Sequence, residues 1–80
     1  MKLIFENSYG TERVIAYPND EAEAIKEIHK FCENHNFKIY YVRSWMSGNR
    51  RKYDCGSWNE FFYLELEKGE IWEENANHIG

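Results

Sequence analysis

An arginine between two aromatic side chains is the pattern in this sequence with the clearest chemical meaning. Arg43 alternates with Tyr41 and Trp45, so in a strand the three side chains share one face. A guanidinium donates planar, bidentate hydrogen bonds to phosphate or carboxylate, and an aromatic ring stacks on a base. The same spacing is also typical of an arginine that packs on a ring to cover a sheet. Both interpretations stay open, and the first predicts a site for an anionic ligand.

Turn-forming residues follow this pattern and extend the candidate site. Gly56 and Ser57 could form a small nest of backbone N–H groups for an anion, with charge added by the basic residues 50–52. The spacing from Ser57 to Glu60 also matches a capping box, which predicts a single turn before a strand. Asp54 and Glu60 could act as an acid–base pair, but a loop-capping role is the better interpretation. The predicted ligand-binding residues are Arg43, Trp45, Arg50, Arg51, Tyr53, Gly56, Ser57, Trp58 and Glu60.

Cysteine and histidine residues offer weaker signals for metal binding or catalysis. His29, Cys32 and His35 recur every three residues of a predicted helix, and this spacing turns them away from one shared face. Cys55 would have to supply the fourth zinc ligand. As a nucleophile, Cys55 would need a histidine base, and nothing in the sequence holds one near it. We therefore expect no metal, no cofactor and no catalytic residue.

The N-terminal half contains two strand patterns and one helix pattern. Residues Lys2–Glu6 and 12–17 are predicted strands, joined as a hairpin by a loop of about five residues, and Pro18 ends the pairing. From 20 to 35, apolar residues recur every three and four positions, and Asp20 or the residue before it provides an N-cap. The helix residues predicted to face the core are Ala24, Ile25, Ile28, Phe31 and Cys32.

The C-terminal half contains two further strand patterns, at 37–45 and 61–67, with a predicted loop of basic residues after Gly48 and Asn49. Residues 70–80 are expected to be a loosely held tail or a short edge element. The fold class is therefore α+β, one small domain over residues 1–80. Its order is β-β-α-β-β, with a four-stranded, mostly antiparallel sheet and one helix on one face. The uncovered face would expose aromatic rings, which predicts a homodimer or a higher homo-oligomer.

Charge and length narrow the classes of function. Residues 37–63 contain nine of the fourteen aromatic residues and a local charge of +3, while the whole chain carries −4. That acidic balance makes direct binding to nucleic acid unfavourable. No apolar run approaches the roughly 20 residues of a membrane helix, and the first residues lack a signal-peptide pattern. We therefore expect no membrane contact, a cytoplasmic location and free thiols at Cys32 and Cys55.

Two stretches of the chain resemble a recurring pattern in small uncharacterised proteins of phages and prophages of Gram-positive bacteria. They are YDCGSWNEFF over residues 53–62 and FKIYYVRSW over residues 37–45, and residues 13–16 with the acidic helix after them are similar too. The resemblance covers most of the chain and is centred on a YDxGSxxEFF-like motif. It implies a short accessory protein, in the host cell cytoplasm, that acts by binding a host defence protein or by sequestering a nucleotide signal. It implies no catalytic residues.

Three classes of function compete. The first is a non-catalytic phage accessory protein, with a counter-defence role, that sequesters an anionic, nucleotide-like ligand on an aromatic and basic surface. The second is an inhibitor of a host defence protein, acting through the same aromatic surface or the acidic side of the helix. The third is a small hydrolytic or redox enzyme that uses Cys55, or Asp54 with Glu60. The clustering of rings and cations in one segment favours the first class.

Overall fold

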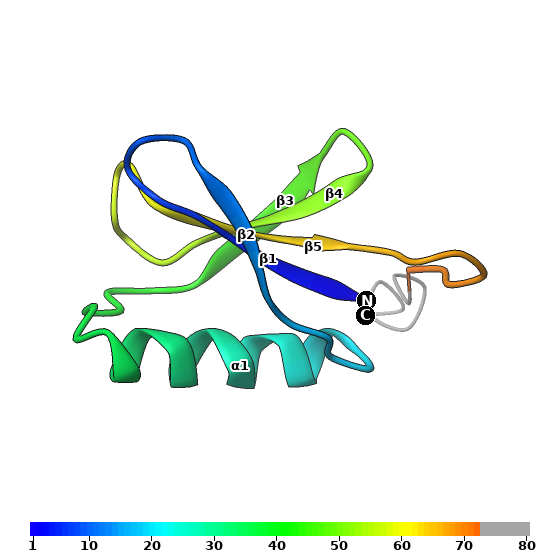
Figure 1. The fold of residues 1–80 in the computed structure, drawn as a ribbon, viewed down its shortest axis with the longest axis horizontal. Coiled ribbons are helices and arrows are strands. Elements are labelled where there is room, and N and C mark those ends of the chain that lie inside the picture. Colours follow the sequence, from blue (N-terminus) through cyan, green and yellow to red (C-terminus); the bar gives the residue numbers. More distant parts are fainter. Residues whose placement is uncertain (73–80) are drawn as a thin grey trace, which may run out of the picture.

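The described chain, residues 1–72 of a computed structural model, forms five strands and one helix. In chain order they are β1 (Lys2–Glu6), β2 (Glu12–Ala16), α1 (Glu21–Asn34), β3 (Arg43–Ser47), β4 (Arg50–Asp54) and β5 (Phe61–Glu65). Figure 1 shows the helix in one layer and a strongly twisted sheet in the other. The α+β class with one helix is confirmed, whereas the prediction of four strands is wrong, because the sheet has five.

The first half of the chain folds within one residue of the predicted bounds. β1 and β2 form an antiparallel hairpin around the loop 7–11, in which the Asn7 side chain accepts two backbone N–H groups at 2.9 and 3.0 Å. The helix begins after Asp20, whose carboxylate accepts the Glu23 N–H at 2.8 Å. Past its end, Asn36 adopts the left-handed conformation with φ +59°. In this half of the chain, turn and capping residues were therefore sufficient to predict where the strands and the helix begin and end.

The second half departs from the prediction at two places. Residues 37–42, predicted to begin the third strand, contain no strand, and β3 follows them. Residues 50–54, predicted as part of a loop, form β4 instead. A two-residue turn at Gly48 and Asn49 folds β4 directly back on β3. Gly48 has φ +68°, which a hairpin turn with glycine at its first central position requires.

The strand pairings in the sheet are antiparallel, and the strand order is β2-β1-β5-β4-β3. β2 and β3 are therefore the two edges. One row of cross-strand partners crosses all five strands and contains Val14, Ile4, Tyr63, Lys52 and Trp45. Because side chains alternate along a strand, this row points away from the helix, and the residues on either side of it point toward the helix.

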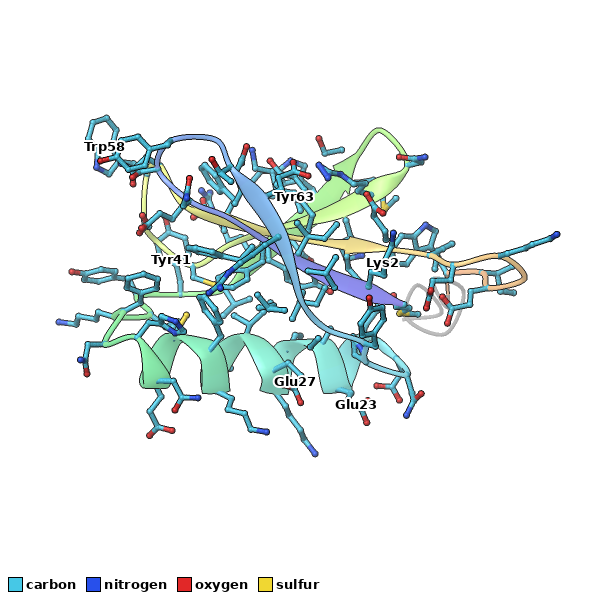
Figure 2. The ribbon with its side chains drawn as sticks, in the orientation of Figure 1. Lys2, Glu23, Glu27, Tyr41, Trp58 and Tyr63 are labelled. Carbon is cyan, nitrogen blue, oxygen red and sulfur yellow. The ribbon has the colours of Figure 1, made fainter. Side chains whose placement is uncertain are left out.

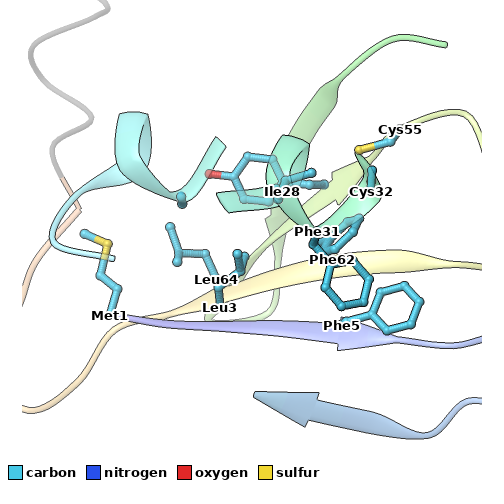
Figure 3. Packing of buried hydrophobic residues seen from close by; sticks show 11 residues of the cluster. Met1, Leu3, Phe5, Ile28, Phe31, Cys32, Cys55, Phe62 and Leu64 are labelled. Carbon is cyan, nitrogen blue, oxygen red and sulfur yellow. The ribbon is translucent and has the colours of Figure 1, made fainter. Parts of the chain in front are cut away.

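The core lies between the helix and the sheet face that it covers. Figure 3 shows the rings of Phe5, Phe31 and Phe62 packed together, with centroids 4.7 to 5.7 Å apart. The predicted helix stripe is buried at Ala24, Ile28, Phe31 and Cys32. The prediction is wrong for Ile25, which is 37% exposed. It lies about 100° around the helix axis from Ala24, at the margin of the buried arc.

The sheet face away from the helix, called the outer face below, is only partly open. Arg50 on β4 donates hydrogen bonds of 3.1 and 2.9 Å to the Glu12 carboxylate on β2, although β5 and β1 separate these strands. Such a contact requires the sheet to coil, so that distant strands approach each other over the outer face. Beneath it, Tyr63 is only 8% exposed, because the Arg50 Cζ lies 4.0 Å from its ring centroid. The expected patch of exposed rings is thus displaced from the centre of this face to its β3 end.

The segment after β5 contains a turn at Lys68 and Gly69, and residues 70–72 form neither a strand nor a helix. The remainder of the predicted tail, residues 73–80, lies outside the described residues. Within residues 1–72, no helix combines the length and the apolar character that crossing a membrane requires.

Candidate functional site

Arg43, the first residue of β3, lies on the outer face beside two aromatic rings. Its Cζ is 5.1 Å from the centroid of the Tyr41 ring and 5.9 Å from that of Trp45. Its Nη2 donates a 2.8 Å hydrogen bond to the Asp54 carboxylate on β4. The arginine side chain is still 64% exposed, so it keeps N–H donors directed at solvent. The sequence-predicted trio therefore occurs as one unit, with a counter-ion.

Lys52 places an ammonium group among three rings of the same face. Its Nζ lies 4.0 Å from the centroid of Phe61, 5.6 Å from that of Tyr63 and 6.0 Å from that of Trp45. No carboxylate of residues 1–72 lies within ion-pair distance of this nitrogen. The rings attract the ammonium electrostatically, but they do not replace the charged hydrogen-bond acceptor that an anion would provide. Below, the cation–ring cluster means Tyr41, Arg43, Trp45, Lys52 and Phe61.

The other two arginines predicted for the site are engaged elsewhere. Arg50 is paired with Glu12 and, at 3.5 Å, with Glu65. Arg51 points to the helix-covered face, where its Nε lies 3.2 Å from a carboxylate oxygen of Glu21 on α1. Both arginines are largely covered by their neighbours. The basic segment therefore offers a ligand fewer free charges than its composition indicates.

The start of the β4–β5 loop is held by contacts within the chain. The Asp54 carboxylate accepts the Gly56 N–H at 2.9 Å in addition to the hydrogen bond from Arg43. The Arg43 hydrogen bond and then the Gly56 one lower the pKa of Asp54 below its usual value. Gly56 has φ +105°, and an added Cβ would lie 2.8 Å from the Tyr40 side chain, so this position requires glycine. The Gly56 N–H, one of the two groups of the predicted nest, thus already donates to a carboxylate of the same chain, which supports a loop-capping role for Asp54.

The rest of this loop forms a bend before β5. The Ser57 hydroxyl donates a 3.0 Å hydrogen bond to the Glu60 carboxylate. This contact joins two side chains and is not the pair of side-chain-to-backbone hydrogen bonds of a capping box, and no helix begins here. Trp58 at the tip is 89% exposed, and Figure 2 shows its ring projecting from the end of the molecule. The β1–β2 loop adjoins this end, because Glu6 and Phe61 are cross-strand partners.

Tyr53 and Cys55 belong to the core rather than to the surface. Tyr53 is 1% exposed on the helix side, and burial raises its pKa to about 12. Cys55 is also buried, and burial raises the pKa of its thiol to about 12. A nucleophilic cysteine needs an accessible thiolate near neutral pH, so this environment disfavours catalysis by Cys55.

The helical histidines and cysteine point in different directions. Cys32 faces the core, whereas His29 and His35 are exposed. The His35 ring stacks on Phe31 with centroids 4.1 Å apart. Within residues 1–72, no three or more His, Cys, Asp and Glu side chains form a group that could hold a metal ion.

Comparisons with other proteins add no assignment. No family model, curated protein or solved structure matches this chain. The geometry of the outer face is therefore the basis for a functional argument.

A hollow of about 480 Å³ lies elsewhere, between the helix and residues 37–39, with Lys26, His29 and Lys30 on its rim.

The structure brings together only part of the predicted site. Arg43 and Trp45 share the cation–ring cluster, while Gly56, Ser57, Trp58 and Glu60 form the adjoining loop. Arg50 forms ion pairs with Glu12 and Glu65, and Arg51 and Tyr53 lie on the opposite face of β4.

Three members of the cluster, Tyr41, Lys52 and Phe61, are absent from the predicted ligand-binding residues. Tyr41 was noted only as a neighbour of Arg43, and Lys52 only as one of the basic residues 50–52 expected to add charge. A signal for Lys52 was present. The Gly48-Asn49 pair predicts a two-residue hairpin, and in the strand after it Lys52 alternates with Arg51 and so lies on the other face.

Proposed function

We propose that the protein is a non-catalytic binding protein that holds an anionic, nucleotide-like ligand at the cation–ring cluster. The observation that carries this proposal is the position of Lys52, whose ammonium lies among the rings of Phe61, Tyr63 and Trp45 with no ion-pair partner in residues 1–72. A phosphate or carboxylate would supply the missing acceptor. Trp45, 41% exposed beside it, offers a ring face on which a base could stack.

The local charge supports the same assignment. The two cations of the cluster, Arg43 and Lys52, have one carboxylate in ion-pair contact, that of Asp54. Glu6, the cross-strand partner of Phe61, lies on the same face and accepts a hydrogen bond from the Tyr63 hydroxyl. The neighbouring Arg50 is neutralised by Glu12 and Glu65 and adds little attraction. One unpaired ammonium suits one small anion better than an extended polyanion, which agrees with the net charge of −4 on the whole chain.

The biological setting belongs to the same proposal. We assign the protein to the cytoplasm, which for a phage protein is the host's cytoplasm, because Cys32 and Cys55 are free thiols as expected in a reducing compartment. A counter-defence role, in which the protein sequesters a nucleotide signal, follows from the resemblance of its YDCGSWNEFF segment to phage accessory proteins. The buried Cys55 thiol supports binding rather than catalysis.

The test is an amide chemical-shift titration with adenosine monophosphate, with adenosine and inorganic phosphate as partial probes. Adenosine monophosphate should shift amides of β3 and β4 and bind more tightly than either partial probe, because only it supplies both the anion and the ring. Lys52→Met, which keeps the aliphatic stem, should weaken its binding at least tenfold, as should Arg43→Ala. Raising the salt concentration should weaken wild-type binding as well.

Lys26→Met is the matched control. Lys26 is exposed on the helix, and its replacement removes the same charge as Lys52→Met. It should leave the titration unchanged. The proposal fails if none of the three probes shifts β3 or β4 amides at millimolar concentration, or if Lys26→Met weakens binding as much as Lys52→Met.

A second candidate, an inhibitor of a host protein, is favoured by the exposed loops at one end of the molecule. Tyr9 and Trp58 lie almost fully exposed on the adjoining β1–β2 and β4–β5 loops, and such apolar surface often contacts a partner. If this is the function, Trp58→Ala and the charge reversal Glu27→Lys on the helix should abolish inhibition of that protein. Lys52→Met should then have little effect.

A further inference from the structure

The two edges of the sheet differ in how they are protected against pairing with another strand. β2 has a register irregularity opposite Leu3 and Ile4, two charged residues, Glu12 and Arg13, and a following proline, Pro18. Bulges, charges and proline are the features by which natural proteins block edge pairing. β2 is thus a guarded edge.

β3 has none of these protections along most of its length. Its register with β4 is regular, it contains no proline, and its one charged residue, Arg43, is at its first position. Its five residues are all exposed, and they include Trp45 and Met46. Figure 1 shows the β3–β4 hairpin extending away from the helix, so the helix does not cover this edge. β3 is an open edge that can accept a further strand.

The hairpin turn determines which backbone groups of β3 face outward. Ser47 and Arg50 flank the two-residue turn and are cross-strand partners, so their N–H and C=O groups are directed at each other. These groups alternate in direction along a strand. The N–H and C=O of Ser44 and Met46 therefore point away from β4 and lack a partner strand in residues 1–72.

A second copy of β3 fits this edge in antiparallel register. Centring the pairing on Trp45 overlaps all five residues, with Ser44 opposite Met46 of the second copy and Arg43 opposite Ser47 of the second copy. The outward groups of Ser44 and Met46 then bond to each other across the two-fold axis. The two Trp45 side chains form a non-hydrogen-bonded pair, the position where cross-strand side chains lie closest, and aromatic pairs are favourable there. No like charges face each other.

We propose that β3 is the interface of a two-fold homodimer in which two β3 strands pair about Trp45 and join the two sheets into one of ten strands. The dimer places two cation–ring clusters side by side on one continuous outer face, because Trp45 belongs to both the edge and the cluster. The dimer depends on the strand edge and its register, and it does not require that the cluster bind an anion.

The test compares the oligomeric state of wild type with that of two charged variants by sedimentation equilibrium. Wild type should approach twice the 9.7 kDa chain mass at high micromolar concentration. Ser44→Glu/Met46→Glu and Ser44→Lys/Met46→Lys should each lose dimerisation, because like charges then face each other twice across the axis. Mixed together, the two variants should form a 1:1 heterodimer, because each glutamate then faces a lysine. That recovery would also show that both variants are folded.

Ser8→Glu/Tyr9→Glu in the exposed β1–β2 loop is the control for added negative charge, and it should remain dimeric. The proposal is overturned if wild type sediments as a 9.7 kDa species at high micromolar concentration, which would leave the edge for a strand of a different protein. It is also overturned if both charged variants remain dimeric alone, since the dimer would then use another surface. A mixture that stays monomeric would exclude the Trp45-centred register.

Discussion

Pairing of individual side chains, rather than the number of charges, decides what the basic segment can offer to a ligand. Arg43, Arg50 and Arg51 each reach a carboxylate, and the three carboxylates come from three different parts of the fold. Lys52 meets rings instead, and in residues 1–72 it has no carboxylate within ion-pair distance. The lysine, which looks least distinctive in the sequence RRKYD, is therefore the residue with the most unused binding capacity.

The Asp54–Arg43 pair predicts a specific dependence of stability on pH. The pKa of Asp54 in the folded protein is lowered, first by the Arg43 hydrogen bond and then by that from Gly56. A carboxyl group whose folded pKa lies below its unfolded value of about 3.9 contributes stability above that value. This contribution is lost as the pH falls through the folded pKa. Asp54→Asn keeps an acceptor for Gly56 but removes the charge.

We therefore expect the free energy of unfolding of wild type to fall more steeply than that of Asp54→Asn between about pH 5 and about pH 2. At neutral pH the variant should be less stable by about 0.2–1 kcal/mol, because Arg43 is well exposed and solvent screens the pair. Urea unfolding at a series of pH values measures both quantities. Parallel curves for the two proteins would show that Asp54 titrates alike in the folded and unfolded chains.

Among the elements, the helix has a buried face that the spacing of its apolar residues predicts, but contact with the sheet decides where that face ends. Its N-terminus is closed by reciprocal contacts, in which Asp20 accepts the Glu23 N–H and Glu23 accepts the Asn19 N–H, both at 2.8 Å. The periodicity places both Ile25 and Ile28 toward the sheet. Only contact with the sheet distinguishes them, and it buries Ile28 completely while Ile25 stays at the margin.

Replacing these two isoleucines with alanine should separate their contributions. Ile28→Ala should lower the free energy of unfolding by about 2–5 kcal/mol, because it opens a cavity in a core that surrounds the side chain. Ile25→Ala, the matched control, should cost less than about 1 kcal/mol, as is typical of exposed positions. Chemical denaturation of both variants measures the difference. Equal losses would place the helix at a different rotation on the sheet.

At the scale of the whole molecule, one small core and one coiled sheet support each other. An 80-residue chain buries only about 60–65% of its unfolded surface, so its stability margin is small. The bidentate contact between Arg50 and Glu12 joins strands that the sheet order separates, and it closes the outer face over Tyr63. Both free cysteines lie within the same core, so their reactivity reports on opening of the whole structure.

Thiol labelling with a disulfide reagent should therefore be slow in the native protein and fast in denaturant. Burial raises the pKa of both Cys32 and Cys55, which slows the reaction further. Ile28→Ala should accelerate native labelling by about 30-fold for each 2 kcal/mol of lost stability, because labelling follows the population of the open form. Ile25→Ala should change the rate little. Rapid labelling of native wild type would contradict the burial of both thiols.

The sequence by itself determined the elements whose signals are local. The β1–β2 hairpin and the helix were predicted within one residue, because turn chemistry, capping and the three-and-four spacing act over a few neighbouring positions. The proximity of Arg43 and Trp45 could also be predicted, since alternation along β3 places them on one face. Tyr41 also lies beside Arg43, although it precedes the strand.

Only the tertiary structure decided the second half of the sheet. Residues 37–42 are rich in aromatic and β-branched residues, as strands are, yet they form no strand. The charged residues of β4, in contrast, pair with β5 on one side and β3 on the other. A strand requires partners, and partners come from distant parts of the chain. The same reason applies to the site. Which cation remains unpaired depends on Glu12, Glu21 and Glu65, and no local pattern in the sequence indicates how near these carboxylates lie.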